Sequence, residues 1–229
     1  MEKIFKQSVW ITLICILPIT IVYASDENNN FYTSGKFISG ISELDEIKNS
    51  GAITGSVSSS VTDDIVGGFS GAVGYKWQQF RFEAEYLWRY RFDFGAQFDG
   101  GVFNKRIIGS NIGTQSFMFN TLWDYENHTK FTPYFGGGIG WAEHEAETTR
   151  SNGSTVRPEP TVTLETTTGN FIWALMLGAK YSFTKNWNID FGYRYADLGE
   201  VEMGPFANGG RVDTDYVSHD ITIGISYNF

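Results

Sequence analysis

The clearest pattern in the chain is the alternation of residue types between positions 80 and 94. The even positions are apolar and mostly aromatic: Phe80, Phe82, Ala84, Tyr86, Trp88, Tyr90, Phe92 and Phe94. The odd positions are mostly charged, with both signs: Arg81, Glu83, Glu85, Leu87, Arg89, Arg91 and Asp93. Because successive side chains of a strand point to opposite faces, the segment predicts a β-strand with an aromatic face and a charged face. A membrane barrel offers both environments, lipid outside and a polar interior.

Seven further segments alternate in the same way, with weaker contrast. They cover residues 31–37, 69–77, 116–125, 135–142, 170–182, 187–195 and 220–229. An even number of strands lets an antiparallel barrel close without a free edge. We therefore expect an all-β fold, an eight-stranded antiparallel up-and-down transmembrane β-barrel.

The connections between these segments alternate between short and long. The short ones are 78–79, 126–130 and 184–186, and the long ones run over about 42–64, 95–106, 143–168 and 199–214. Outer-membrane barrels place short turns in the periplasm and long loops outside the cell. The pattern predicts four long extracellular loops, with the last strand ending in the periplasm. The first and fourth loops are acidic, through Glu43, Asp45, Glu46, Asp63, Asp64, Glu200, Glu202, Asp213 and Asp215.

The charged face of the predicted strands is expected to form a network of ion pairs inside the barrel. Its members are Lys36, Lys76, Arg81, Glu83, Glu85, Arg89, Lys180, Asp190 and Arg194. Eight strands enclose little more room than side chains fill. Gly136, Gly138 and Gly140 leave space there for the long charged side chains of neighbouring strands. A packed interior is therefore the favoured interpretation, and a small low-conductance pore is the alternative.

The N-terminal segment is typical of a cleavable signal peptide. Lys3 and Lys6 precede an apolar run from Val9 to Val22, and Ala24 offers a small residue for cleavage. We expect residues 1–24 to be removed and residues 25–229 to form the barrel domain. The one cysteine, Cys15, lies in the removed segment, so the mature chain is expected to form no disulfide and no thiolate metal site.

Composition and motifs indicate little chemistry. The formal net charge of −9 is unfavourable for binding nucleic acid. In 143–147 the three glutamates share one strand face and His144 the other, which suggests an acidic loop base rather than a metal site. His219 falls on the lipid-facing set beside Ile221, which is unfavourable for a lipid-modifying enzyme at the outer rim. His128 lies in a short turn. We expect no enzymatic activity, no cofactor and no dedicated metal site, and weak bridging of calcium or magnesium by the loop carboxylates stays open as an alternative.

Four stretches carry a family resemblance: 31–37, 133–140, 191–199 and 219–229. They resemble the opacity-protein and OmpA-like superfamily of eight-stranded outer-membrane surface antigens, and the first also resembles the rickettsial major surface antigens. The C-terminal stretch is similar to the signal read by the barrel assembly machinery. The positions that match this assembly signal are Ile223, Ile225, Tyr227 and Phe229.

The resemblance implies a protein of the bacterial outer membrane that lies among its lipids and lipopolysaccharide, with its loops extracellular. It also implies a structural or antigenic role, with adhesion to host cells or host proteins through the loops. The alternatives are the small pore and, less favoured, an enzyme that modifies lipids of the outer leaflet. No individual ligand-binding residue can be carried over from the family, since the loops share no motif with it.

Overall fold

The computed structural model describes residues 30–51, 56–61, 63–99, 105–152, 161–206 and 209–229. The segment expected to be a signal peptide lies outside these residues. The strands are β1 (Phe31–Ser50), β2 (Ser56–Val61), β3 (Asp63–Trp77), β4 (Phe80–Asp99), β5 (Lys105–Asp124), β6 (Phe131–Asn152), β7 (Val162–Ser182), β8 (Trp187–Met203) and β9 (Arg211–Asn228). Within this part of the chain no helix is long and apolar enough to span a bilayer.

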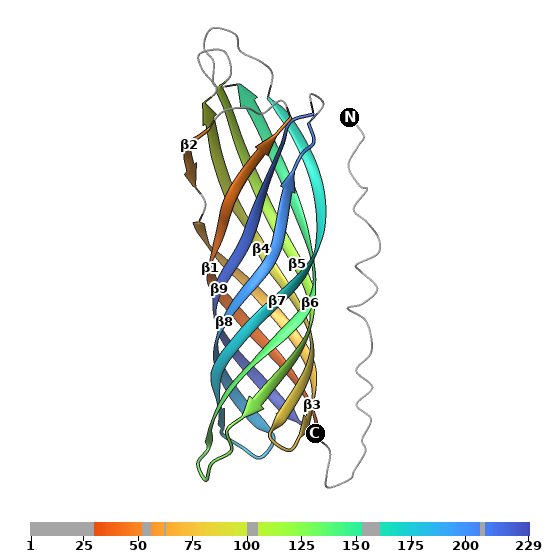
Figure 1. Ribbon diagram of the computed structural model, residues 1–229. Coiled ribbons are helices and arrows are strands. Elements are labelled where there is room, and N and C mark those ends of the chain that lie inside the picture. Colours follow the sequence, from red (N-terminus) through yellow and green to blue (C-terminus); the bar gives the residue numbers. More distant parts are fainter. Residues whose placement is uncertain (1–29, 52–55, 62, 100–104, 153–160, 207–208) are drawn as a thin grey trace, which may run out of the picture.

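The strands close into a tall, tilted barrel (Figure 1). They follow one another in the order β3, β1, β9, β8, β7, β6, β5 and β4, and β4 pairs back with β3. Every pairing is antiparallel, including the closing pair of β1 and β9. The short β2 pairs with the outer end of β4, beyond the part that pairs with β3. Together β2 and β3 occupy one strand position, so the expected eight-stranded barrel is confirmed.

The strands are far longer than the sequence pattern indicated. β4, β5, β6 and β7 each contain 20 to 22 residues, whereas a tilted strand crosses a bilayer in about 9–11 residues. The excess lies at the outer end of the barrel. The predicted length of the four extracellular loops is therefore wrong, because most of the residues assigned to them continue the strands. In chain order these continuations include 43–50, 95–99, 143–152, 162–168 and 199–203.

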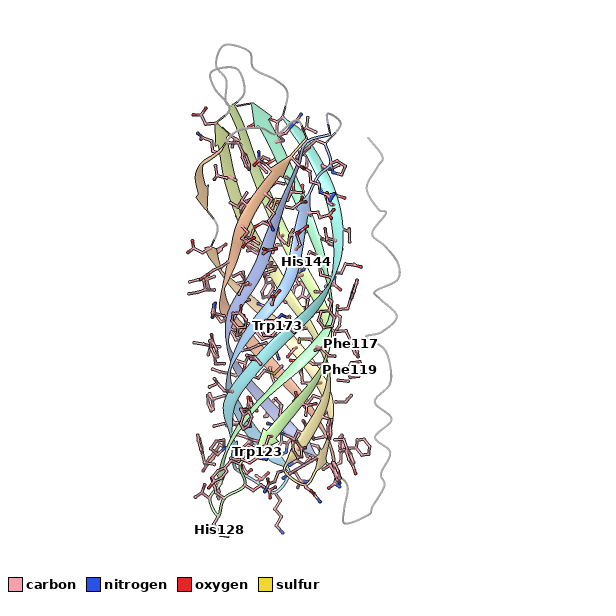
Figure 2. All side chains as sticks on the ribbon, in the orientation of Figure 1. Phe117, Phe119, Trp123, His128, His144 and Trp173 are labelled. Atoms are coloured by element: carbon pink, nitrogen blue, oxygen red, sulfur yellow. The ribbon has the colours of Figure 1, made fainter. Side chains whose placement is uncertain are left out.

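The three short turns are confirmed by the strand boundaries. β3 and β4 join through Gln78 and Gln79, with Gln78 at a φ of 55°. The other two turns follow β5 and β7 at the same end of the barrel. Figure 2 places His128 at the tip of one of them, well away from His144.

The pattern of exposure along each strand separates two faces. Around the barrel, large apolar side chains point outward and are exposed; examples are Phe69, Phe119, Ile139, Leu177 and Ile221. Tryptophan, tyrosine and phenylalanine gather near the short turns, where Trp123 packs against Tyr125 and Phe135. Trp173 and Tyr195 pack together further up the wall. Apolar bands edged by aromatic residues are typical of a barrel surface in contact with lipid.

A closed interior, an apolar plug and an acidic outer surface

The half of the interior next to the short turns contains a network of ion pairs. Arg81 donates from Nε to Asp124 at 2.8 Å and from Nη1 to Glu83 at 3.4 Å. Lys36 lies 3.4 Å from the other oxygen of Glu83, and Lys180 lies 3.2 Å from Asp124. Both carboxylates are thus shared by two cations. Such pairing is the condition under which charges are tolerated away from water.

Further up, two more cations meet carboxylates across the interior. Arg194 donates to Glu85 at 2.6 Å, and Asn120 donates to the same oxygen at 2.7 Å. Arg89 donates to both oxygens of Asp220, at 2.9 and 2.5 Å. Arg89 and Asp220 are almost completely buried, at 1% and 0% exposure of their side chains. These pairs connect strands from the first and second halves of the chain.

Eight of the nine residues expected in the interior network lie there. Lys76 is the exception: it lies at the periplasmic rim, half exposed, and pairs with Glu126 at 2.7 Å. Asp190 is held by the Tyr134 hydroxyl at 2.7 Å rather than by a cation. Asp124 and Asp220 also belong to the network, although they are not among the nine expected residues. Strand parity could have found them, because Asp124 lies an even number of residues from Asn120 on β5, and Asp220 from Thr222 on β9, and all four are buried.

The interior glycines on β6 make room for neighbours, but mostly not for the charged residues expected. A Cβ at Gly136 would meet Leu122, and one at Gly140 would meet Met118. A Cβ at Gly138 would overlap the amide of Asn120, the side chain that holds Glu85. The glycines therefore act on the charge network indirectly, by allowing the backbone and side chains of the neighbouring strand β5 to lie close against β6.

The outer half of the interior is an apolar core. It contains Leu44, Phe92, Phe94, Phe98, Ile108, Ile112, Val201, Met203, Phe206 and Val212. The alternation between 80 and 94 had predicted Phe92 and Phe94 to face lipid and Arg91 to face the interior. That prediction is wrong, because a bulge between Arg89 and Phe92 reverses the alternation on β4. Phe92 is 3% exposed, and the Arg91 side chain is 45% exposed.

His144 lies in this outer region, on β6 rather than in a loop. Its ring is buried, with Nδ1 2.9 Å from the Thr114 hydroxyl and Nε2 2.8 Å from the carbonyl oxygen of Leu198. The ring also packs against Tyr216. Glu143 and Glu147 on the same strand point outward, as the parity argument predicted. Because His144 and these carboxylates occupy opposite faces, one metal ion cannot bind them together.

We expect the stability of the barrel to fall in mild acid because of His144. Burial lowers the pKa of the imidazole from 6.5 to about 4, and nearby Arg89 acts in the same direction. The residue lies beyond Trp141, the last apolar outward residue of β6. Above pH 6.5 both states hold a neutral ring, so its stabilising contacts are fully present. As pH falls from 6.5 towards 4, only the unfolded chain gains the proton. The free energy of unfolding therefore falls by up to about 3 kcal/mol.

Urea unfolding of the refolded protein at pH 7.5, 5.5 and 4.5 would measure this dependence. The His144→Gln variant keeps polar atoms for Thr114 and Leu198 but has no proton to gain in this range. Its free energy of unfolding should therefore fall less between pH 7.5 and 4.5 than that of the parent. Identical losses in parent and variant would contradict the assignment to His144.

His219 does not form a catalytic group with its neighbours. It points outward, and its Nδ1 lies 2.7 Å from the hydroxyl of Tyr193. Ser218 and Asp220 point to the interior, where the Ser218 hydroxyl donates to Asp220 at 2.7 Å. The serine and the acid that a rim hydrolase would need therefore lie on the other side of the wall from the histidine.

The outer surface of the strand extension is strongly acidic. Within the described residues, carboxylates face each other directly across neighbouring strands: Glu43 and Asp63, Glu147 and Glu165, Glu200 and Asp215, and Glu202 and Asp213. Like charges at directly opposite positions of a sheet are destabilising. The arrangement therefore does not serve the stability of the sheet.

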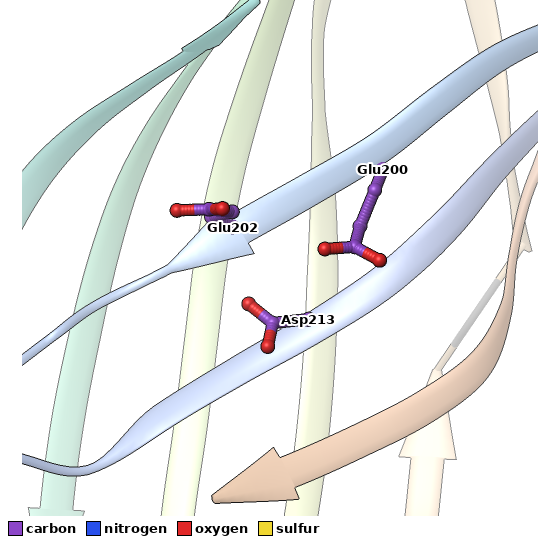
Figure 3. A group of neighbouring side chains, drawn as sticks. All are labelled: Glu200, Glu202 and Asp213. Atoms are coloured by element: carbon purple, nitrogen blue, oxygen red, sulfur yellow. The ribbon is translucent and has the colours of Figure 1, made fainter. Parts of the chain in front are cut away.

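One group of these carboxylates has the spacing of a cation site (Figure 3). Oxygen atoms of Glu200, Glu202 and Asp213 lie within 4.8 Å of one another. Arg211 donates to Asp213 at 2.7 Å and to Glu202 at 3.1 Å. A guanidinium group thus already neutralises two of the three carboxylates, and the group is better explained as an arginine-bridged cluster.

The residues of the expected assembly signal end the last strand on its lipid-facing side. Ile223, Ile225 and Phe229 are exposed to between 41% and 50%. The ring of Tyr227 packs against Trp187 and Phe229. The residues form one outward row at the periplasmic end of β9, next to both β8 and β1.

A closed antiparallel barrel with an apolar belt outside and paired charges inside defines the class of bacterial outer-membrane β-barrels. The chain belongs to the family described as outer membrane protein beta-barrel domain, whose model matches residues 12–229. The protein is therefore located in the bacterial outer membrane.

Three known proteins illustrate the relationship. Outer membrane protein PagN of Salmonella typhimurium strain LT2 is 27% identical over 243 residues, which cover 94% of this chain and 98% of PagN. The outer membrane protein OprG of Pseudomonas aeruginosa has a similar fold, with a TM-score of 0.56, 19% identity and coverage of 88% of this chain and 96% of OprG. Neisserial surface protein A gives a TM-score of 0.53, 14% identity and coverage of 87% and 97%.

Proposed function

We propose that this protein is a non-enzymatic surface barrel that holds an acidic binding surface above the outer membrane. The observation that carries the proposal is the continuation of paired strands beyond the lipid-facing belt, with carboxylates on their outer side. Paired strands with an apolar core form a rigid platform, which positions side chains better than loops do. The role is structural and antigenic, with adhesion to a host-surface ligand.

The charge of this platform favours a basic ligand. Glu145 and Glu147 lie on the outer face of β6, with side chains 43% and 52% exposed, and Arg91 is their nearby cation. Glu165 on β7 lies directly opposite Glu147. Two carboxylates repel each other when no cation is near. Their electrostatic interaction becomes favourable when a cationic group of a partner lies between them. A basic segment of a host protein fits this surface better than an anionic glycan.

The packed interior disfavours the alternative function, a small pore. A conducting path would have to cross the buried layer of Arg194, Glu85 and Asn120, each at most 2% exposed. It would then have to cross the apolar core at the outer end, which contains Phe98, Ile112 and Val201. A path through both layers would require ion pairs and packed apolar side chains to separate together.

The wider partners of the protein follow from its position. Its exposed apolar belt contacts the outer-membrane lipids, and the strand extension rises into the lipopolysaccharide layer. We propose that Ile223, Ile225, Tyr227 and Phe229 form the signal read by the barrel assembly machinery. Their placement as one outward row at the end of the last strand supports that role.

Adherence of bacteria that display the protein to cultured host cells would test the function. We expect the Glu147→Gln, Glu165→Gln double variant to adhere several-fold less, and the remaining adherence to depend less on salt, because screening acts on the exposed charges. Glu126→Gln is the matched control, since it removes a carboxylate at the periplasmic end. Adherence equal to that of the parent in the double variant would refute a role for this surface.

A further inference from the structure

A polar cavity of about 480 Å³ opens at the periplasmic end of the barrel. Its walls come from the ends of several strands and from two of the short turns. The residues that matter for its chemistry are Phe31, Lys76, Arg81, Glu126, Lys180 and Lys185. A volume of this size accommodates a small ligand or the headgroup of a lipid.

The lining is basic although the chain as a whole is acidic. Lys76, Arg81, Lys180 and Lys185 contribute cations to the cavity, and Glu126 contributes the carboxylate of the lining. Glu126 is paired with Lys76. Arg81 and Lys180 are also paired with Glu83 and Asp124 behind the lining, so a small positive excess remains around the cavity in a protein whose formal net charge is −9.

Two of these cations have hydrogen-bond donors to spare. Arg81 is 3% exposed, and its Nη2 has no hydrogen-bond partner within the described residues. Lys185 forms no ion pair with the described part of the chain. A buried guanidinium nitrogen without a partner is costly, and Arg81 is one of the residues that line the cavity.

The fixed position of Arg81 makes it suited to binding an anion. Its guanidinium is held by Asp124 and Glu83 and lies 4.7 Å over the ring of Tyr134. Because other contacts already order the side chain, little conformational entropy remains to be lost on binding. Lys76, Lys180 and Lys185 add further donors around this fixed one.

We propose that this cavity binds a phosphate group. Arginine and lysine together are the usual partners of phosphate, through charge-assisted hydrogen bonds. Phe31, which is 57% exposed at the lipid-facing rim, also lines the cavity. The phosphate can therefore belong to a phosphorylated solute of the periplasm or to a phospholipid headgroup of the inner leaflet.

Calorimetric titration of the protein, purified from outer membranes into a phosphate-free detergent, would test the site. Inorganic phosphate and glycerol 3-phosphate are the probes. We expect both to bind, and Lys185→Gln to weaken binding about tenfold, the loss of one charge-assisted hydrogen bond. Arg81→Lys keeps the charge but removes Nη2, and it should also weaken phosphate binding. Heat-modifiable migration on gels checks that each variant is folded.

The matched control is Lys130→Gln, which removes an exposed lysine that does not line the cavity, although its turn contributes Glu126 and Asn127 to the lining. Its affinity for phosphate should equal that of the parent. The absence of binding in detergent, or equal weakening by Lys130→Gln and Lys185→Gln, would overturn the proposal. Repeating the titration in phosphatidylglycerol nanodiscs identifies the source: lost binding assigns the site to the lipid headgroup, and retained binding assigns it to a solute.

Discussion

Replacing Asp220 with alanine is expected to lower the free energy of unfolding by about 3–5 kcal/mol. The substitution leaves the guanidinium of Arg89 buried at 1% exposure without a counter-ion. Removing one partner of a buried pair costs this much because the other charge remains in a medium of low polarity. Ser218, which also accepts a hydrogen bond from Arg89 at 3.0 Å, provides no charge to replace the carboxylate.

Urea unfolding of the protein refolded in detergent, followed by tryptophan fluorescence and by gel migration, would measure the loss. Two controls make the cause specific. The Arg89→Met, Asp220→Leu double variant removes both charges and should recover most of the stability. Glu145→Ala breaks the exposed pair with Arg91 and should cost at most about 1 kcal/mol. A small loss in Asp220→Ala would mean that water reaches Arg89.

Replacing Phe92 with alanine is the second change with a large expected effect. Phe92 is buried in the apolar core of the outer half and packs against the ring of Tyr216. Truncation of a buried phenylalanine typically costs about 3–5 kcal/mol, through lost burial and the cavity that remains. The loss should be concentrated in the strand extension, where β4 meets β5 beyond the bulge.

The matched control for Phe92 is its neighbour Tyr90, which points outward at 43% exposure. Tyr90→Ala should cost much less, since its ring does not fill the interior. Strict alternation along β4 would give both residues the same lipid-facing position and similar small effects. Two measurements therefore test the bulge directly. One is unfolding in urea, and the other is the rate at which protease cleaves the outer end of the barrel on intact cells. Equal losses for the two variants would place Phe92 outside the core.

The fold was predictable because its strongest signals are local. Alternation on β4 from Phe80 to Arg89 follows from the two environments of a barrel wall, and the short turns follow from chain connectivity. The length of the strands was not predictable in this way. Beyond the membrane the outward face of the strands becomes polar. Segments that contain residues such as Glu143 and Thr167 therefore resemble loops in composition, although they are paired in strands.

The interior was predictable only as far as the alternation persisted. Bulges on β4 after Arg89 and on β8 after Asp197 shift the parity, and neither has a strong sequence signal. Gly199, with a φ of +77°, is the one local hint at the second bulge. The pairing of Arg89 with Asp220 also lay beyond sequence reasoning, because parity assigns a face but not a partner on a distant strand.

The closure of the barrel between β1 and β9 constrains the order of events during folding. The contacts of Arg194 with Glu85 and of Arg89 with Asp220 span 109 and 131 residues of sequence. Neither contact can form while the sheet is still an open ribbon, since the strands concerned are then far apart. Contacts of such long range slow folding, because the chain loses conformational entropy on closing before the contacts contribute any stabilising energy. A partly formed sheet would present unpaired arginines and carboxylates to the bilayer, so insertion and closure should occur as one cooperative step.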